Sequence, residues 1–344
     1  MRFAQLESGT VRLVDVPEPH AGPGELVVRM AACGVCGTAL AKLKGNYRAS
    51  SILGHEPVGL VSEVGSGVSG YETGDRVFVH HHVPCGACAV CVRGDPTFCP
   101  TYATTNLDPG GFSESFRVSA RHVKAGAVLR LAPGISWDEG SLLEPAGCVV
   151  TALHRVGFSP GTSVFVYGLG PAGLLYARLA RAMGATWVGG AELSPRRRAV
   201  AESGGIDAVV DPRDPQGVSS VVENATEGRG VDLAVVATSA PAAIQGALEI
   251  VRRAGTVNLF GVPATGSRLD YDLLQLYLRG IRIVPTYATT EPDIREVHAQ
   301  VAARRLRLAD LVSDRFPLSD IASAFARARD AESSVKVVVT GPAY

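Results

Sequence analysis

Four cysteines fall within one short stretch of this chain, and they constrain its fold more than any other feature. Their spacing is C-x2-C-x2-C-x7-C, and glycine and proline leave the stretch little apolar material to pack. Four thiolates so close in sequence are typical of the closed tetrahedral shell of structural zinc. Zinc binding contributes on the order of 10 kcal/mol, enough to order such a loop in place of a core. The predicted ligands are Cys85, Cys88, Cys91 and Cys99.

Other states of these four cysteines stay open at this point. They could form two disulfides or remain free thiols, and an iron–sulfur cluster also uses four cysteines. Against disulfides, residues 1–10 carry no apolar secretion segment, and the chain has 7 cysteines, an odd number. Both features favour a reducing compartment, so the predicted location is the cytoplasm.

Length and charge exclude several classes of protein. At 344 residues the chain is longer than a usual domain, so two domains are expected. Lys and Arg together number 33, as do Asp and Glu, which leaves no net positive field for nucleic acid or an anionic membrane surface. The sequence contains no apolar run of the roughly 18 residues that would span a bilayer. We therefore predict a soluble globular protein without a nucleic-acid or membrane partner.

A second set of metal-binding residue types lies in the β-rich part that fills residues 1 to about 80. It consists of a C-x-x-C pair ending at Cys36 and of the pair His55-Glu56. Alone, the first is also typical of a redox pair and the second of an ordinary surface, but together they favour a second metal site. Further on, Glu144 lies among leucines and valines, where a lone buried carboxylate costs several kcal/mol. It needs a partner, and a metal is the obvious one.

From about residue 151 the pattern changes to alternating strands and helices. A short apolar strand, Ser163 to Tyr167, leads directly into G-x-G-x-x-G and then into a helix, the context in which this motif binds a dinucleotide. The glycines allow a tight turn, close approach of the pyrophosphate and close packing of helix on strand, and the helix N-terminus receives the phosphates. The predicted contacts are Gly168, Gly170, Pro171, Ala172 and Gly173.

Glu192, at the end of the next strand, indicates which cofactor binds. A carboxylate there accepts the ribose hydroxyls and repels a 2′-phosphate, which favours NAD over NADP. Arginines follow at 196–198, and Arg197 is also predicted to contact the cofactor, since arginine stacks on adenine or holds the extra phosphate. NADP therefore stays open as the second choice. The remaining predicted contacts follow a later strand: Phe260, Gly261 and Val262.

Strand-like runs begin near residues 163, 187, 208, 233, 256 and 281, with helical stretches between them. This alternation predicts a doubly wound parallel sheet. The predicted domains are a β-rich domain from residues 1–150 and 286–344, and an α/β dinucleotide-binding domain from residues 151–285.

Taken in order, these motifs resemble the zinc-containing medium-chain dehydrogenases/reductases, the superfamily of alcohol and polyol dehydrogenases, over essentially the whole chain. The resemblance implies a GroES-like catalytic domain with a zinc lobe at 85–99, and a Rossmann domain that binds NAD. It also implies two zinc ions per chain, a small alcohol or ketone as substrate, and a homo-oligomer, either a dimer or a tetramer.

The same resemblance assigns the ligands of a catalytic zinc. Cys36 is followed by Gly-Thr, as the family's first ligand is by Gly and Ser or Thr, and His55 is the second ligand. Glu144, in Leu-Glu-Pro, matches the glutamate ligand of the sorbitol-type branch, in which Glu56 also enters or leaves the shell.

By the same resemblance, Thr38 takes the alcohol proton while hydride passes to C4 of the nicotinamide. A zinc-bound water or Glu56 is the alternative proton acceptor. The family usually has Asp after this Thr and His a few residues beyond, but this chain has Ala-Leu-Ala. The onward proton path is therefore open, with Lys42 and Tyr47 as candidates.

Two further groups are predicted to have structural roles. The run of three histidines, His80 to His82, is expected to be a strand end rather than a ligand set, because alternate strand residues face opposite sides. Cys33 and Cys148 are expected to be packing cysteines.

The main prediction is an oxidoreductase that uses zinc and NAD on a secondary alcohol of the polyol, sugar or cyclitol class. One alternative is a zinc-free reductase of alkenes or quinones in the same superfamily, which Cys36, His55 and Glu144 together disfavour. Another is a non-catalytic nucleotide-binding protein, which only an activity measurement distinguishes.

Overall fold

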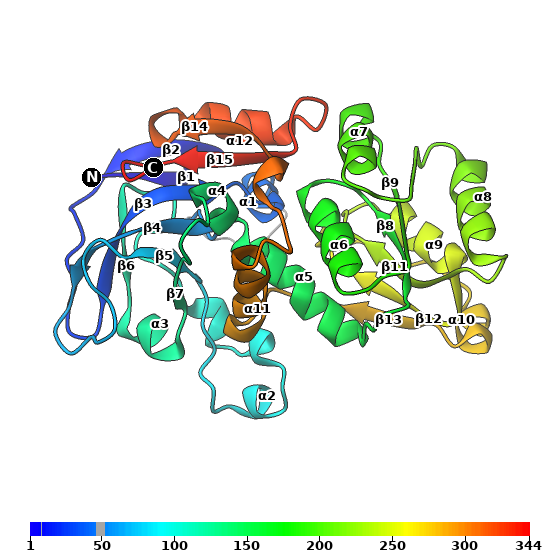
Figure 1. Ribbon diagram of the computed structural model, residues 1–344, viewed down its shortest axis with the longest axis horizontal. Helices are drawn as coiled ribbons and strands as arrows, with labels where there is room; N and C mark the ends of the chain where they lie inside the picture. The colour runs from blue at the N-terminus through cyan, green and yellow to red at the C-terminus, as the bar shows by residue number, and fades with distance from the viewer. Residues whose placement is uncertain (8, 46–51) are drawn as a thin grey trace. The chain divides into compact units, whose positions relative to one another are not determined.

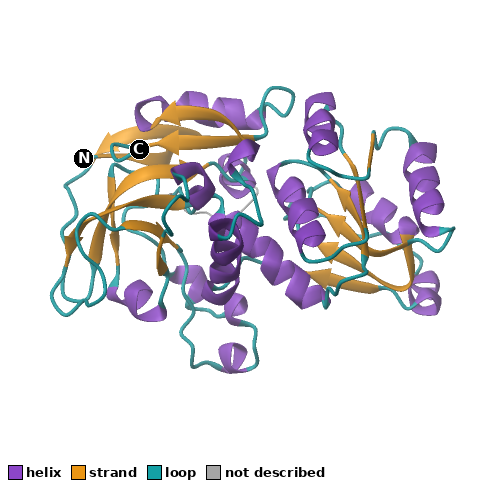
Figure 2. Cartoon of the chain, in the orientation of Figure 1, coloured by secondary structure: helices purple, strands orange, loops and turns teal. Residues whose placement is uncertain are grey.

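The computed structural model describes residues 1–7, 9–45 and 52–344 (Figure 1). The chain divides into two compact units, each described here by itself. The first unit consists mainly of strands and loops, and the second alternates strands with helices (Figure 2). The first comprises Met1–Cys148, Ala288–Asp330 and Ser334–Tyr344, and the second comprises Val149–Tyr287 and Ala331–Ser333.

The first unit is built on a largely antiparallel sheet with the strand order β14-β15-β3-β4-β5-β7. Strand β6 pairs with β3 off this path, and β1 and β2 form a separate antiparallel pair. The central strand β3 is buried at all but one position. The strands are β1 (Arg2–Glu7), β2 (Thr10–Asp15), β3 (Leu26–Gly34), β4 (Pro57–Val64), β5 (Arg76–Val79), β6 (Ser115–Val118), β7 (Val128–Arg130), β14 (Val312–Pro317) and β15 (Lys336–Thr340).

Short helices connect these strands, and local sequence explains where some begin. Helix α4 starts with a capping box, in which Ser136 accepts from the Glu139 amide and Glu139 accepts from the Ser136 amide. The unit's core includes Leu26, Met30 and Phe112. The α-helices are α1 (Gly37–Leu43), α2 (Ala89–Val92), α3 (Ala120–Ala125), α4 (Trp137–Ser141), α5 (Leu143–Val156, which belongs to the second unit from Val149 on), α11 (Glu291–Ala302) and α12 (Ile321–Arg329), and the 3-10 turns are η1 (Pro96–Phe98), η2 (Tyr102–Thr104), η3 (Ala309–Leu311) and η4 (Leu318–Asp320).

The second unit is a parallel sheet with the strand order β10-β9-β8-β11-β12-β13. The order reverses between β8 and β11, which is the switch point of a doubly wound dinucleotide-binding fold, as predicted. Helices α6 to α9 each begin with proline, whose fixed φ suits the first helical position. The elements are β8 (Ser163–Tyr167), α6 (Pro171–Ala182), β9 (Trp187–Ala191), α7 (Pro195–Ser203), β10 (Ala208–Val210), α8 (Pro215–Thr226), β11 (Val231–Val236), α9 (Pro241–Ile250), β12 (Val251–Leu259), α10 (Leu273–Arg279) and β13 (Arg282–Pro285).

The predicted bounds of β8 are confirmed, and β9 and β10 begin at the predicted residues 187 and 208, whereas β1 and β14 were missed. Strand β14 lies at the edge of its sheet, and most of its positions are half-buried or exposed. Its sequence, VSDRFP, therefore lacks the apolar run that marks a buried strand. In the described residues, no helix is both long and apolar enough to cross a membrane.

Candidate active site and metal centres

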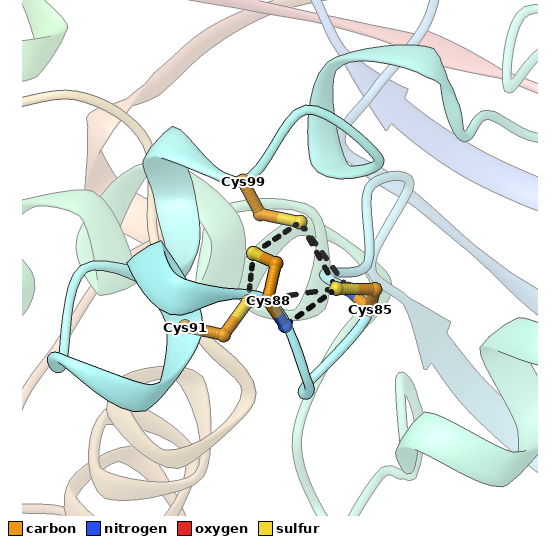
Figure 3. Close-up of side chains that lie close together, drawn as sticks. All are labelled: Cys85, Cys88, Cys91 and Cys99. Atoms are coloured by element: carbon orange, nitrogen blue, oxygen red, sulfur yellow. Dashed lines mark hydrogen bonds between the residues drawn. The ribbon is translucent and has the colours of Figure 1, made fainter.

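The four lobe cysteines converge on a common centre in the first unit (Figure 3). Cys88 caps α2, Cys91 lies within that helix and Cys99 caps η1, so short helical turns set three of the four sulfurs. Four of the sulfur pairs lie 3.5 to 4.0 Å apart. Tetrahedral zinc with bonds of about 2.3 Å places its sulfurs roughly 3.8 Å apart, so the lobe fits one such ion.

The alternatives for the lobe fit this geometry less well. A disulfide joins sulfurs about 2.05 Å apart, and all four cysteines are free thiols here. A multi-iron cluster would separate sulfurs that bind different iron atoms. Backbone amides favour the thiolate form of Cys99. Burial raises the pKa of this thiol, but hydrogen bonds from the amides of Cys85 and Tyr102 more than offset burial and lower the pKa to about 5.

A second donor group gathers where β3 leads into α1 and where β4 begins. Cys36 caps α1, and His55 and Glu56 directly precede β4. One ligand atom of each residue lies within 4.8 Å of the others. Gly54 makes this possible, because its φ is +82° and a Cβ there would lie 2.3 Å from the Phe112 amide nitrogen. A thiolate, an imidazole and a carboxylate are the donor types of a catalytic zinc.

Glu56 is fully buried and has one oxygen committed. Its Oε2 accepts a 2.6 Å hydrogen bond from Nζ of Lys336, while its Oε1 has no partner among the described residues. Burial lowers the pKa of Lys336, but Glu56 and Cys36 more than offset this, so that pKa is raised. An orphaned buried carboxylate oxygen is expensive without a cation, which is further support for a metal here.

Glu144 groups with different neighbours from those the resemblance implies. It lies in the first turn of α5, and its carboxylate is within 4.8 Å of donor atoms of His80 and His81. Burial raises the pKa of Glu144 to about 8. The two donor groups adjoin, because the His55 and His81 rings have centroids 5.0 Å apart.

The three histidines directly follow a strand end, as expected, but two of them lie in a possible metal-binding group with Glu144. Strand β5 ends at Val79, so strand alternation does not apply to the residues after it. His80 and His81 both reach the Glu144 group, and Nδ1 of His81 is buried without a partner among the described residues. His82 instead turns to the Thr105 carbonyl and packs against the His81 ring.

The two remaining cysteines differ from each other. Cys33 is fully buried in the core, in agreement with the prediction of a packing role. The Cys148 thiol donates to Oε1 of Glu144 across 3.5 Å, one helical turn away, so this cysteine also supports a candidate ligand. Burial raises the pKa of the Cys148 thiol well above its usual value, so the thiol keeps the proton that it donates.

Thr38 lies beside the first donor group. Its Oγ1 is 3.6 Å from the Cys36 sulfur and accepts from it while Cys36 is a thiol. Among the onward candidates, Lys42 donates to the Ile52 carbonyl at 3.1 Å. Burial lowers the pKa of Lys42. Tyr47 lies outside the described residues.

Sequence reasoning missed several residues of this site. Lys336 is the most important, and His80 is tied to Glu291 at 3.0 Å and to the Tyr102 hydroxyl at 3.2 Å. The signal for Lys336 was present, since a lysine inside the run Val335 to Val339 is a charge within a buried strand.

The nucleotide motif of the second unit has the expected local geometry. Gly168 follows β8 with φ of +90°, and Gly170 caps α6, which begins at Pro171. A Cβ on Gly173 would lie 1.9 Å from the Gly168 carbonyl oxygen, so the helix can approach the strand only with glycine there. Ala172 is in the first turn of α6, whose amides face any bound phosphate.

Glu192 has a second role that the sequence did not indicate. It is only 9% exposed, and its Oε2 accepts from the Leu169 amide at 2.9 Å while Oε1 accepts from the Ser194 amide at 3.0 Å. The carboxylate therefore fixes the glycine loop. A carboxylate has about four acceptor positions, so both oxygens can still accept ribose hydroxyls.

The arginines after β9 point in different directions. A Cβ on Gly170 would lie 3.3 Å from Nη1 of Arg197, so this guanidinium lies beside the glycine loop. Arg198 is instead held by Asp211 at 3.1 Å and by the Glu192 carbonyl at 2.7 Å. Arg197 is thus the arginine that lies close to the loop.

The three predicted contacts after β12 lie at the carboxyl end of the sheet. The Phe260 ring packs edge-on against Tyr176 of α6, with centroids 5.2 Å apart. The Gly261 amide donates to the Val236 carbonyl at 2.7 Å, and a Cβ on it would lie 2.6 Å from the Thr238 amide nitrogen. Val262 is exposed. Ligands of doubly wound sheets bind at this end.

Two sequence families match the chain. The family described as the alcohol dehydrogenase GroES-like domain matches residues 22–127, and the family described as zinc-binding dehydrogenase matches residues 171–303.

Individual relatives extend the likeness over most of the chain. An L-threonine 3-dehydrogenase of Pyrococcus abyssi is 36% identical over 271 residues, covering 77% of this chain and 76% of its own. A sorbitol dehydrogenase of Gallus gallus is 30% identical over 345 residues, covering 96% and 94%. A D-altritol 5-dehydrogenase of Agrobacterium fabrum is 28% identical over 340 residues, covering 96% and 97%.

Solved structures agree with the fold of the whole chain. The 2R,3R-butanediol dehydrogenase of Bacillus subtilis has a TM-score of 0.85 at 25% identity, over 98% of this chain and 99% of its own. A protein of Sinorhizobium meliloti solved with NADP bound has a TM-score of 0.87 at 27% identity, over 98% of each chain.

Proposed function

We propose that this chain oxidises a polyhydroxylated secondary alcohol with NAD at a zinc ion, since it belongs to the polyol-dehydrogenase branch of the zinc-containing medium-chain dehydrogenase/reductase family. Membership itself makes it an oxidoreductase that acts on alcohols, with the GroES-like and Rossmann folds of that family. The substrate class, the metal dependence and the choice of NAD are our proposal.

One observation carries the proposal. Three donors of zinc-binding type, Cys36, His55 and Glu56, converge within 4.8 Å, and the Thr38 hydroxyl lies 3.6 Å from the Cys36 sulfur. A reductase that works without zinc has no need of a thiol, an imidazole and a buried orphan carboxylate oxygen at one point. Glu144 lies in the adjoining group and is our candidate for a further ligand.

Each residue then has a chemical task. Zinc held by these residues would lower the pKa of a coordinated alcohol, and the nicotinamide would accept the hydride. Thr38 is placed to take the alcohol proton at Oγ1, because its hydroxyl lies 3.6 Å from the Cys36 sulfur and can pass its own proton onward as it accepts that of the alcohol. Glu56, committed to Lys336, is the alternative acceptor.

The four-cysteine lobe is proposed to hold a second, structural zinc, which gives two ions per chain. The sulfur separations of 3.5 to 4.0 Å support one tetrahedral ion. Free thiols at all described cysteines also support a reducing compartment, and we place the enzyme in the cytoplasm.

A homo-oligomer, either a dimer or a tetramer, is also proposed. Strand β13 is an edge of its parallel sheet, and the neighbouring α10 exposes large apolar side chains. Leu273 is 75% exposed and Tyr277 is 82% exposed, which is unusual for an unassociated surface.

The choice of substrate and cofactor is tested together. Purified enzyme is assayed with a panel of polyols, cyclitols and amino alcohols, with NAD and with NADP. We expect a polyol or cyclitol to give the highest kcat/KM, and NAD to be preferred. Replacing Glu192 with glutamine should raise the NADP to NAD ratio of kcat/KM about tenfold, since repulsion of a 2′-phosphate is lost while the side-chain shape is kept.

The control is Glu202→Gln, an exposed acid on α7, which should leave the ratio unchanged. A wild-type preference for NADP would contradict the cofactor assignment and point to Arg197. If no alcohol in the panel yields reduced cofactor, the non-catalytic alternative gains support.

Replacing Thr38 with valine tests the first proton acceptor. The change keeps the shape and removes the hydroxyl, so kcat for alcohol oxidation should fall by about 10²-fold. Binding of NADH, followed by fluorescence titration, should not change. Thr10→Val, at an exposed strand position, is the matched control. Full activity of Thr38→Val over about pH 6 to 9 would assign the role to Glu56 instead.

A further inference from the structure

We propose that Lys336 is a positioning residue for the catalytic metal: it holds Oε2 of Glu56, leaves only Oε1 to the metal, and so keeps the second carboxylate oxygen from closing the metal's open position. The inference rests on the proposed metal function of the Cys36, His55 and Glu56 group. It concerns a residue that lies 280 positions from its partner in the chain.

Strand pairing brings the lysine to the site. In the antiparallel pairing of β15 with β3, Val338 lies opposite Gly34, so Lys336 at the start of β15 extends past the end of β3. In the pairing of β3 with β4, Cys33 lies opposite Pro57, which places Glu56 at the same end. Three segments distant in sequence thus converge at the end of one sheet.

The contact between the two charges is close and closed to water. Nζ of Lys336 donates to Oε2 of Glu56 at 2.6 Å and to the Val35 carbonyl at 3.2 Å. The side chains of Lys336 and Glu56 are 3% and 0% exposed. No rearrangement of water can replace this bond, so Lys336 fixes the direction of the carboxylate.

Gly34 shows that the local sequence is fitted to this pair. A Cβ at position 34 would lie 1.7 Å from Oε2 of Glu56 and 2.9 Å from Cε of Lys336. Any larger residue would therefore displace the ion pair. The glycine is required by the space that the pair occupies.

A purely stabilising role does not explain the pair. A buried ion pair is seldom more stable than apolar residues of the same size, so its presence favours a functional reason. Oε1 of Glu56 has no partner among the described residues, which suits a carboxylate held next to a cation. The charges also balance: two on zinc and one on Lys336 offset the anionic forms of Cys36, Glu56 and Glu144.

In this geometry Lys336 and the metal compete for the same carboxylate oxygen, Oε2 of Glu56. Without the lysine, Oε2 of Glu56 loses its donor, and the carboxylate is free to turn both oxygens toward the metal. The ion would then be bound more tightly and with one ligand more, since catalytic zinc sites expand to five ligands. A merely structural lysine predicts the opposite, because a loosened site holds its metal less well.

The test uses Lys336→Met, which removes the charge and keeps the apolar stem. Zinc affinity of the full-length protein is measured by competition with a chromogenic chelator, and the ligand number by the visible spectrum of the cobalt(II)-substituted protein. We expect zinc to bind about tenfold more tightly, equivalent to about 1.4 kcal/mol, because one more carboxylate oxygen joins the shell. We also expect the catalytic cobalt band to lose intensity, as a higher ligand number requires.

Two further variants complete the design. In a Glu56→Gln background, Lys336→Met should change neither the affinity nor the spectrum, because the competing carboxylate is gone. If Lys336→Met fails to fold, Lys336→Gln keeps one hydrogen bond without the charge and should shift both readouts in the same direction. The cobalt–thiolate bands of the cysteine lobe appear in every variant and cancel in difference spectra.

The outcomes separate this inference from the proposed function. Wild-type protein that binds metal in the lobe alone would overturn the proposed function. Two metals per chain, with weaker zinc binding and an unchanged cobalt band in Lys336→Met, would overturn the inference alone. Two metals with tighter binding and a weakened band, both abolished by Glu56→Gln, would establish it.

Discussion

Replacing Cys36 with serine is expected to lower kcat/KM for alcohol oxidation by about 10³-fold or more, equivalent to about 4 kcal/mol of transition-state stabilisation. Cys36 contributes the thiol of the first donor group and also contacts Thr38, so one change removes a metal ligand and disturbs the proton acceptor. The measurement is steady-state kinetics together with metal content per chain, which should fall by one ion. Nucleotide binding should persist, because the glycine motif belongs to the other compact unit.

Cys33→Ser is the matched control for this change. Cys33 lies three residues away and is fully buried, but its sulfur is in the core and in neither donor group. It should cost some stability and leave the metal content unchanged. Cys36→Ser with full metal content and full activity would contradict the assignment of the first donor group as the catalytic centre.

The second unit was predicted from sequence more accurately than the first, for a physical reason. Its parallel strands are buried on both faces, so β8 and β9 appear as short unbroken apolar or small-residue runs with clear ends. In the first unit, β14 is an edge strand in which Ser313, Asp314 and Arg315 interrupt the pattern. Its pairing with β15 is set by tertiary contacts that no local pattern records.

The residues of the candidate site also differ in how well the sequence predicts them. Candidate ligands that lie close together in the chain, such as the lobe cysteines or His55 and Glu56, can be recognised from their spacing in the sequence. The bond from Lys336 to Glu56 joins residues 280 positions apart, and its only sequence signal is a lysine within an apolar run. The proximity of His81 to Glu144 was not expected, because strand alternation was assumed past Val79, where β5 ends.

Replacing Cys88 with serine is expected to unfold the cysteine lobe while leaving the dinucleotide-binding unit folded. Cys88 caps α2 and its sulfur lies 3.5 Å from Cys91 and 3.7 Å from Cys99, so its loss opens the tetrahedral shell. The lobe has little apolar core, and zinc binding of on the order of 10 kcal/mol is what orders it. That figure is comparable with the total stability of a domain, roughly 5 to 15 kcal/mol.

Because the lobe can open locally, only part of this loss reaches the rest of the protein. We expect the apparent Tm of the first unit to fall by roughly 10 °C, the lobe to become sensitive to protease, and the metal content to fall by one ion per chain. Val92→Ser is the matched control, since Val92 lies in the same helix, is 75% exposed and contributes no sulfur. A Cys88→Ser protein that retains two metals and the protease resistance of Val92→Ser would show that these cysteines do not form a zinc site.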